Sequence, residues 1–150
     1  MGESTRILVV DDDESIRKVL STILVEEGYA VDTAKNGKEA INKSNEKFYN
    51  LALIDIRLPD IQGVELLSKI RDTVPKMRKI IITGYPSLQN AVESLNRGAN
   101  AYIMKPFEME KVLKTIKEQL RKQQEEKSYC KRKLKISLKH ASKNWKKRKL

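Results

Sequence analysis

Side chains with the chemistry to handle phosphate occur in four separate places along the chain. They are Asp11, Asp12, Asp13, Asp55, Thr83 and Lys105. Carboxylates crowded together repel each other, since two unit charges about 4 Å apart interact by about 4 kcal/mol at an effective dielectric constant of about 20. A divalent cation relieves this repulsion, and an all-oxygen set of ligands suits magnesium. With a lysine and a hydroxyl nearby, such a set could take up a phosphoryl group by in-line attack of an aspartate oxygen.

Each of these residues also has a purely structural explanation. Asp13 and its neighbours could cap a helix, and for Asp13 alone this explanation is the stronger one. Asp55 could be a loop acid, Thr83 a capping hydroxyl and Lys105 a solvated side chain. The chemical interpretation therefore depends on whether the elements between these residues bring all of them to one place.

The elements predicted between these residues bring all of them to one edge of a sheet. Short apolar segments typical of strands occur at residues 6–10, 29–33, 51–54, 79–82 and 101–104. Each is followed by apolar residues at helical spacing, at residues 16–24, 37–44, 64–70, 88–95 and 109–120. Strict alternation predicts an α/β fold, a parallel sheet with helices on both faces. The carboxyl ends of its strands form the functional edge, and four of the five strands end in one of the residues above.

The net charge of +11 is concentrated in the last 30 residues. Residues 1–120 contain 18 Lys and Arg and 18 Asp and Glu, whereas residues 121–150 contain 13 Lys and Arg and two acids, Glu125 and Glu126. Thirty residues rarely hold a core of their own. We therefore predict a globular domain over residues 5–120 and a basic C-terminal extension over residues 121–150 that is not an independent domain.

Composition argues against several other classes of protein. No segment approaches the roughly 18–20 apolar residues of a membrane span, and no signal-peptide pattern opens the chain. The single cysteine, Cys130, excludes an internal disulfide, and Cys130 with His140 cannot complete a four-ligand zinc site. We expect no role for either residue and a cytoplasmic location for the protein.

Four motifs, in this order, resemble those of response-regulator receiver domains. They are Ile-Leu-Val-Val-Asp-Asp at 7–12, Leu-Ile-Asp-Ile-Arg-Leu-Pro-Asp-Ile-Gln-Gly at 53–63, Ile-Thr-Gly-Tyr at 82–85 and Tyr-Ile-Met-Lys-Pro-Phe at 102–107. The resemblance covers about residues 5–120, and the loop sequences are most similar to those of receivers of the nitrogen-regulator type. It implies a flavodoxin-like (βα)5 three-layer sandwich with strand order 2-1-3-4-5. It also implies a two-component response regulator that a histidine kinase phosphorylates, not an enzyme.

The resemblance further implies how the site is divided among its residues. Asp55 would be the phosphoacceptor, and Mg²⁺ would be bound by Asp11, Asp12, Asp55 and the backbone carbonyl of Arg57. Lys105 would pair with Asp55 at rest and with the phosphoryl group afterwards.

The resemblance also implies a switch. Thr83 would move toward the phosphoryl group, whose charge is roughly −1.5 to −2, and Tyr102 would change rotamer with it. This would reshape the face formed by the fourth helix, fifth strand and fifth helix, so that a downstream protein or a second copy of the chain could bind there. Arg57 and Tyr85 would flank the path of the hydrolytic water and tune the phosphoryl lifetime. The bond between Lys105 and Pro106 would be cis.

The segment Val-Val-Asp-Asp-Asp-Glu-Ser at 9–15 leaves one enzymatic alternative open. Asp11 and Asp13 resemble the nucleophile and the acid/base of haloacid-dehalogenase-like phosphatases. Those enzymes also need an acidic pair after another strand, whereas Asp55 is a lone acid. The receiver interpretation therefore fits the sequence better.

The basic extension allows several interpretations. Good helix formers predict that the last helix runs from Glu108 to about Lys127. Beyond it, the spacing of Leu134, Leu138, Ala141 and Trp145 predicts a basic amphipathic helix, whereas the alternation at 133–139 suits a strand and the composition also suits disorder. Its function could be to bind nucleic acid, an anionic membrane or an acidic protein. The basic run at 146–149 resembles a nuclear-localisation signal, a common pattern.

Overall fold

The computed structural model describes the backbone of residues 4–149 and the side chains of residues 4–144. Strands and helices alternate throughout this part of the chain. The strands are β1 (Arg6–Val10), β2 (Ala30–Ala34), β3 (Leu51–Asp55), β4 (Arg78–Thr83) and β5 (Ala101–Met104). The helices are α1 (Glu14–Glu26), α2 (Gly37–Glu46), α3 (Gly63–Lys69), α4 (Leu88–Asn96) and α5 (Met109–Lys149). The alternation expected from the apolar segments is confirmed.

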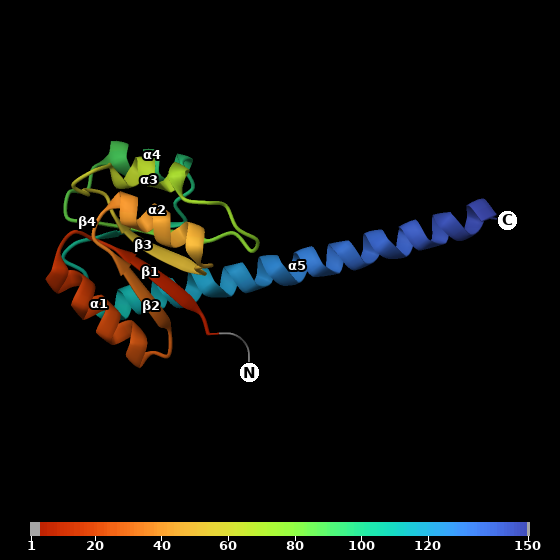
Figure 1. Cartoon of the computed structure of the whole chain (residues 1–150), viewed down its shortest axis with the longest axis horizontal. Helices are drawn as coiled ribbons and strands as arrows, with labels where there is room; N and C mark the ends of the chain where they lie inside the picture. The colour runs from red at the N-terminus through yellow and green to blue at the C-terminus, as the bar shows by residue number, and fades with distance from the viewer. Residues whose placement is uncertain (1–3, 150) are drawn as a thin grey trace.

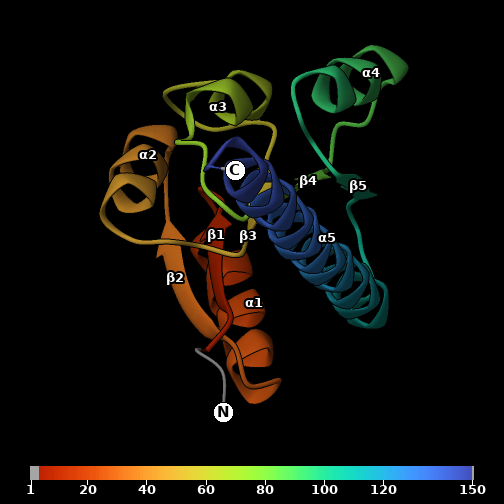
Figure 2. The ribbon, with the colours of Figure 1, turned by 90° about the vertical axis from the view of Figure 1, so that its right-hand side faces the viewer.

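The five strands form one parallel sheet in the order β2-β1-β3-β4-β5, as predicted. Helices α2, α3 and α4 lie on one side of it, and α1 and α5 lie on the other (Figures 1 and 2). The register pairs Val10 with Ile54, Asp55 with Ile82, and Thr83 with Met104. The carboxyl ends of four neighbouring strands are thereby aligned at one edge.

The core consists of two apolar layers because successive residues of a strand point to opposite faces of the sheet. In β1, Leu8 and Val10 belong to the layer under α2 and α3, while Ile7 and Val9 belong to the layer under α1 and α5. Residues 51–55 of β3 and 78–83 of β4 are buried along their whole length. These central strands pack on both faces, which explains their apolar runs at 51–54 and 80–82. Two buried cations, Arg78 and Lys79, precede the apolar run of β4.

Capping residues fix the ends of helices α1 and α4. The side chain of Asp13 accepts hydrogen bonds from the backbone N–H groups of Ser15 and Ile16, so the capping role predicted for Asp13 is confirmed. Gly28 follows α1 with φ +96° and Gly98 follows α4 with φ +103°, a left-handed conformation that glycine adopts without strain.

The last helix runs far beyond the sheet. Helix α5 has 41 residues and continues from the body as a straight projection (Figure 1). Of the alternatives for residues 128–149, the helical one is therefore correct, and the strand suggested by the alternation at 133–139 is wrong. The side chains of Trp145 and of the basic run at 146–149 lie outside the described residues. In the described part of the chain, no helix has the length and apolar character needed to cross a bilayer.

Candidate functional site

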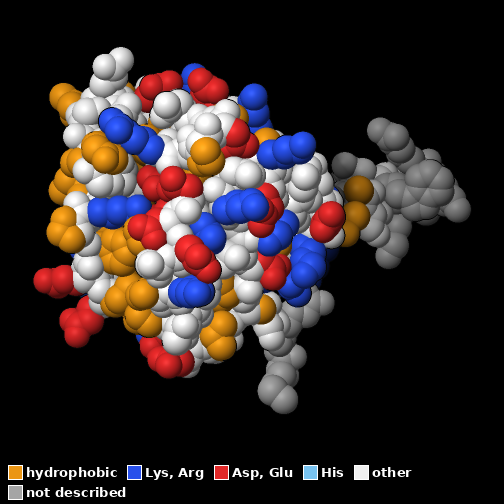
Figure 3. Space-filling view, turned by 60° about the vertical axis from the view of Figure 1, so that its left-hand side comes forward, with side chains coloured by type: hydrophobic (Ala, Val, Ile, Leu, Met, Phe, Trp, Pro, Cys, Tyr) orange, Lys and Arg blue, Asp and Glu red, His pale blue; other side chains and the backbone are white. Residues whose placement is uncertain are grey.

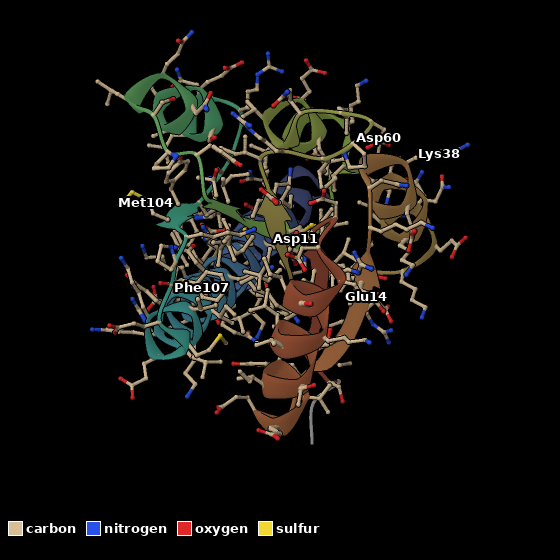
Figure 4. The ribbon with its side chains drawn as sticks, turned by 90° about the vertical axis from the view of Figure 1, so that its left-hand side faces the viewer. Asp11, Glu14, Lys38, Asp60, Met104 and Phe107 are labelled. Carbon is tan, nitrogen blue, oxygen red and sulfur yellow. The ribbon has the colours of Figure 1, made fainter. Side chains whose placement is uncertain are left out.

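Three carboxylates meet where β1 and β3 end. Asp11 follows β1 directly and Asp55 is the last residue of β3, and these strands are neighbours. Each of Asp11, Asp12 and Asp55 offers an oxygen within 4.8 Å of the other two. Asp11 and Asp55 are only 3% and 8% exposed, whereas Asp12 is open to solvent. Figure 4 looks onto this end of the sheet, with Asp11 near the centre.

The backbone holds these carboxylates in place. One oxygen of Asp11 accepts a hydrogen bond from the backbone N–H of Asp13 at 2.9 Å, and the Arg57 N–H donates to Asp55 Oδ1 at 3.2 Å. The guanidinium of Arg17 donates to the carbonyl oxygen of Asp11 at 2.7 Å. The side chains of Asp11 and Asp13 thus have different tasks, because Asp13 caps α1 and Asp11 faces Asp55.

Lys105 forms ion pairs with both buried acids. Its ammonium lies 2.9 Å from Asp11 Oδ2 and 3.3 Å from Asp55 Oδ2. Burial alone lowers the pKa of Lys105, but the hydrogen bond and charge of Asp11, followed by those of Asp55, outweigh it and raise the pKa overall. Lys105 is therefore charged across the physiological pH range. The peptide bond between Lys105 and Pro106 is cis, as the resemblance implied, and the bond between Val74 and Pro75 is cis as well.

The carboxylate set fits a divalent cation. Burial raises the pKa of Asp55, the negative charge of Asp11 raises it further, and Lys105 only partly offsets these effects. One ammonium thus shares two buried carboxylates, with a third, exposed carboxylate beside them. Three acidic oxygens at such spacing form the hard-ligand set that Mg²⁺ prefers, so Asp11, Asp12 and Asp55 form an acidic cluster consistent with a magnesium site.

Thr83 and its neighbours form the other side of the site. Thr83 ends β4 fully buried, its hydroxyl accepts a hydrogen bond from the Tyr85 N–H at 3.0 Å, and its carbonyl accepts one from the Lys105 N–H at 2.7 Å. A side-chain carbon added at Gly84 would lie 3.8 Å from Lys105 Cβ. The ends of β4 and β5 therefore place a hydroxyl, a bare glycine and the lysine next to one another.

Tyr102 lies in β5 with its ring turned inward. The ring packs, partly buried, against the apolar layer under α2 and α3. Burial raises the pKa of its hydroxyl, which has no hydrogen-bonding partner among the described side chains. The residue thus sits behind Thr83 along the sheet edge, since Tyr102 pairs with Ile81 and Met104 pairs with Thr83.

The structure adds contacts that sequence reasoning missed. The guanidinium of Arg57 lies 3.6 Å from the centre of the Tyr85 ring, a cation–π contact between two loops at the sheet edge. Asp60 accepts hydrogen bonds from the N–H groups of Gly37 and Lys38 at 2.8 and 2.9 Å, which lowers the pKa of Asp60, and Figure 4 shows Asp60 beside Lys38. The first contact joins two loops and the second joins a loop to the start of α2. Contacts of this kind leave no periodic signal in a sequence.

Ionisation of Asp55 should destabilise the folded state. The folded state raises the pKa of Asp55, so it favours the protonated carboxyl group. The stability that this group contributes is fully present below the unfolded pKa near 3.8 and is lost as the pH rises through the folded pKa. We expect Asp55→Asn to increase the free energy of unfolding by about 1–2 kcal/mol at pH 7 without divalent cations. The gain should shrink as the pH falls toward 4. Urea denaturation of both proteins across this range measures it, and a gain independent of pH would contradict the proposed cause.

The fold and the acidic cluster together define a doubly wound α/β domain, with carboxylates consistent with a magnesium site at the carboxyl ends of its strands. The family model described as the response regulator receiver domain matches residues 7–117. The chain therefore belongs to the response regulator receiver family, a family of two-component signalling domains and not of enzymes. The phosphatase alternative is wrong, and the capping role of Asp13 in α1 agrees with this.

Individual relatives agree with this assignment. A CheY-like receiver domain protein from Methanospirillum hungatei JF-1 is 49% identical with a TM-score of 0.79, and the match covers 83% of this chain and 99% of that one. TrrA from Thermotoga maritima, solved in complex with Mg²⁺–BeF, is 37% identical with a TM-score of 0.67, over 77% and 98% of the two chains. The beryllofluoride-activated NtrC4 receiver domain, solved as a dimer, is 42% identical with a TM-score of 0.74, over 79% and 98%.

Curated relatives are longer than this chain. Those that match at 37–41% identity over 119 residues cover 79% of this chain, but the chain spans only between 27% and 54% of their length. The receiver domain is thus the shared part.

Proposed function

We propose that Asp55 is the phosphoacceptor of this receiver. Receiver domains partner histidine kinases, and here an oxygen of Asp55 would attack the phosphoryl group of a phosphohistidine. The N–P bond breaks as the O–P bond forms, which leaves an aspartyl phosphate and a neutral histidine. The observation that carries this proposal is the ammonium of Lys105, which contacts both Asp11 and Asp55 within 3.3 Å.

The other residues of the site have supporting roles in this proposal. Asp11, Asp12, Asp55 and the backbone carbonyl of Arg57 would hold Mg²⁺, which would supply positive charge to the phosphoryl oxygens. Lys105 stays at the site and pairs with the phosphoryl oxygens once Asp55 is phosphorylated. The Thr83 hydroxyl donates a hydrogen bond to the phosphoryl oxygens. Its proton is available for this, because the hydroxyl only accepts a hydrogen bond, from the Tyr85 N–H.

Phosphorylation of Asp55 would also change a surface away from the site. As Thr83 turns toward the phosphoryl group, Tyr102 fills the space behind it and reshapes the face of α4, β5 and α5. This face carries exposed apolar side chains, which are Leu88, Val92, Leu95 and Met104. Figure 3 shows hydrophobic side chains gathered along one edge of the body. A downstream protein, or a second copy of the chain after phosphorylation, would bind here.

The direct test is phosphorylation by a small acyl phosphate with Mg²⁺, followed by intact mass measurement. Wild type should gain one phosphoryl group and Asp55→Asn none. The matched control is Asp13→Asn, since asparagine caps a helix as well as aspartate does and the control should still be phosphorylated. Uptake of phosphate by Asp55→Asn, or its loss in Asp13→Asn alone, would contradict the proposal.

Arg57 and Tyr85 should set how long the phosphoryl group lasts. Their stacked side chains flank the proposed path of the hydrolytic water, so removing either one should open it. We expect Arg57→Ala and Tyr85→Ala each to shorten the lifetime about fivefold, which corresponds to about 1 kcal/mol in the barrier.

Two further variants separate the stacking from other effects. Tyr85→Phe keeps the ring and should keep the wild-type lifetime, and the double alanine variant should be no faster than either single one, because the two residues act as a pair. The decay of the phosphorylated species by mass measures all four. Unchanged lifetimes in both single variants would exclude this role.

We also propose that the chain consists of a receiver domain at 5–120 and a basic extension at 121–150. The extension is not an independent domain, and α5 is continuous across the boundary. The excess charge of the extension suits an anionic surface, either nucleic acid or an anionic membrane. The two-component role and the free thiol of Cys130 favour action in the cytoplasm.

A further inference from the structure

Between Lys127 and Asn144, helix α5 packs against no other described part of the chain. The contacts to the body end in a polar group at the amino ends of the strands, where Gln123 Nε2 donates to the carbonyls of Asn50 and Lys76, both at 2.9 Å, and Arg78 pairs with Glu126. From Lys127 to Asn144 every residue is exposed, and Figure 1 shows the helix projecting into solvent. These contacts fix where the projection starts, and nothing in the described part of the body supports the rest.

The projection carries one sign of charge. Between residues 127 and 144 there are seven Lys and Arg and no acid. The two acids before it are already paired, Glu125 with Arg121 and Glu126 with Arg78. Five of the lysines recur at every fourth residue, a spacing that places them next to one another on a helix, and they are Lys127, Lys131, Lys135, Lys139 and Lys143. Each such like-charge pair costs an isolated helix a few tenths of a kcal/mol. A bound polyanion converts this repulsion into attraction.

The distribution of side chains around the helix favours nucleic acid over a membrane. Four residues advance about 40° beyond a full turn, so the five lysines spread over nearly half the circumference. Leu134 and Leu138 share one side of the helix, but Ile136 lies on the opposite side, so a helix lying in lipid would leave one of these apolar groups in water. A helix in the major groove of a duplex has phosphates along both flanks, which suits charges spread this widely.

The base of the projection continues the basic surface. A groove of about 1250 Å³ lies where α5 leaves the body, and it is lined by the cations Arg6, Lys47 and Lys127 together with Phe48, Asn50 and Gln124. Arg6 and Lys47 also lie 3.7 and 3.6 Å from Asp32, which offsets one of these charges. The groove is at the amino ends of the strands, opposite the edge that holds Asp11 and Asp55. It can therefore take phosphates without blocking the site.

We propose that the projecting part of α5, with the groove at its base, binds the sugar–phosphate backbone of a nucleic acid duplex without sequence preference. This inference rests on the anion-binding role proposed above for residues 121–150 and is independent of phosphorylation at Asp55. If all five lysines of the row meet phosphates, the logarithm of the binding constant should fall with the logarithm of salt concentration with a slope of about −4 to −5.

The test is fluorescence anisotropy of a labelled 20-base-pair DNA duplex with the full chain, titrated at several salt concentrations. Changing Lys131, Lys135 and Lys139 together to Gln should make the slope shallower by about 3 and weaken binding on the order of 100-fold at 0.15 M salt. The matched control changes three exposed lysines of the body, Lys35, Lys38 and Lys69, to Gln and should bind like wild type. Equal losses in both triple variants, or two unrelated duplexes bound with very different affinities, would overturn the proposal.

A second experiment distinguishes binding to a nucleic acid duplex from binding to an anionic membrane. Leu134→Gln with Leu138→Gln removes the larger apolar side of the helix and should leave duplex binding within about twofold, whereas it should abolish binding to a membrane. Vesicles containing phosphatidylserine are the probe. Vesicle binding without duplex binding would keep the anion-binding role and overturn this inference, and binding of neither would overturn both. Phosphorylation of the same preparations by a small acyl phosphate reports separately on Asp55.

Discussion

Replacing Lys105 by methionine should slow phosphorylation of the domain by a small acyl phosphate at least 100-fold. Lys105 is the cation that contacts both Asp11 and Asp55, at 2.9 and 3.3 Å. Removing one preorganised charge from a site where charge develops in the transition state typically costs a factor of about 100 to 1000. Methionine fills similar space without charge, so the loss would report electrostatics. The rate of mass gain at fixed acyl phosphate and Mg²⁺ measures it.

The pKa of Asp55 provides an independent check on the same variant. Burial and Asp11 already raise this pKa, and Lys105 is what opposes them. Without the lysine the pKa should rise further, which a carbon-detected NMR titration of the carboxyl group can follow. The matched control is Lys114→Met, on an exposed position of α5, which should change neither quantity. A Lys105→Met protein with a normal rate and an unshifted Asp55 would show that the contact is incidental.

Gly63→Ala should destabilise the domain by about 3 kcal/mol, at the upper end of the usual cost of overpacking. A Cβ at residue 63 would lie 2.3 Å from the carbonyl oxygen of Asp55 and 2.8 Å from the Cα of Ile56. Both atoms belong to the backbone that carries Asp55, and the Gly63 N–H also donates to the Ile56 carbonyl at 2.7 Å. The clash therefore cannot be relieved by a side-chain rotation. Because the displaced segment holds Asp55, phosphorylation should fall as well.

Gly37→Ala is the matched control for this substitution. Gly37 also begins a helix, and its added Cβ would lie 2.1 Å from a methyl carbon of Ile61, which is a side-chain atom that can move. We expect a cost of about 1 kcal/mol and a normal rate of phosphorylation. Urea denaturation of both variants compares them directly. Equal costs would mean that contact with the Asp55 backbone is not what requires glycine at residue 63.

Sequence patterns predicted the scaffold because its signals are local. Apolar runs such as 51–54 can only be satisfied in a strand buried on both faces, and strict alternation with helices then leaves one sheet type. The functional edge followed from that topology, since Asp11, Asp55, Thr83 and Lys105 each stand at a strand end. The order of the strands came instead from the resemblance to receivers, because no pattern within a strand encodes its neighbour.

Other features could not be derived from the sequence because they depend on contacts between distant segments. The Arg57–Tyr85 stacking joins two loops, and the close approach at Gly63 joins the start of α3 to the end of β3. The whole fold sets both approaches. The extension was ambiguous for a different reason. Its alternation at 133–139 and its helical spacing are both real patterns, and without a packed face neither has tertiary contacts to select it. The helix found there is continuous with the packed part of α5, which provides its nucleus.

The chemical position of the phosphoryl group tests the central claim most directly. An aspartyl phosphate is a mixed anhydride, so borohydride reduces it to homoserine and leaves unmodified aspartates intact. After phosphorylation with a small acyl phosphate and Mg²⁺, peptide mass spectrometry of the reduced protein should find homoserine at residue 55 and nowhere else. Homoserine at residue 11 or 12, or a phosphoryl group that resists reduction, would contradict the assignment of Asp55 as the acceptor.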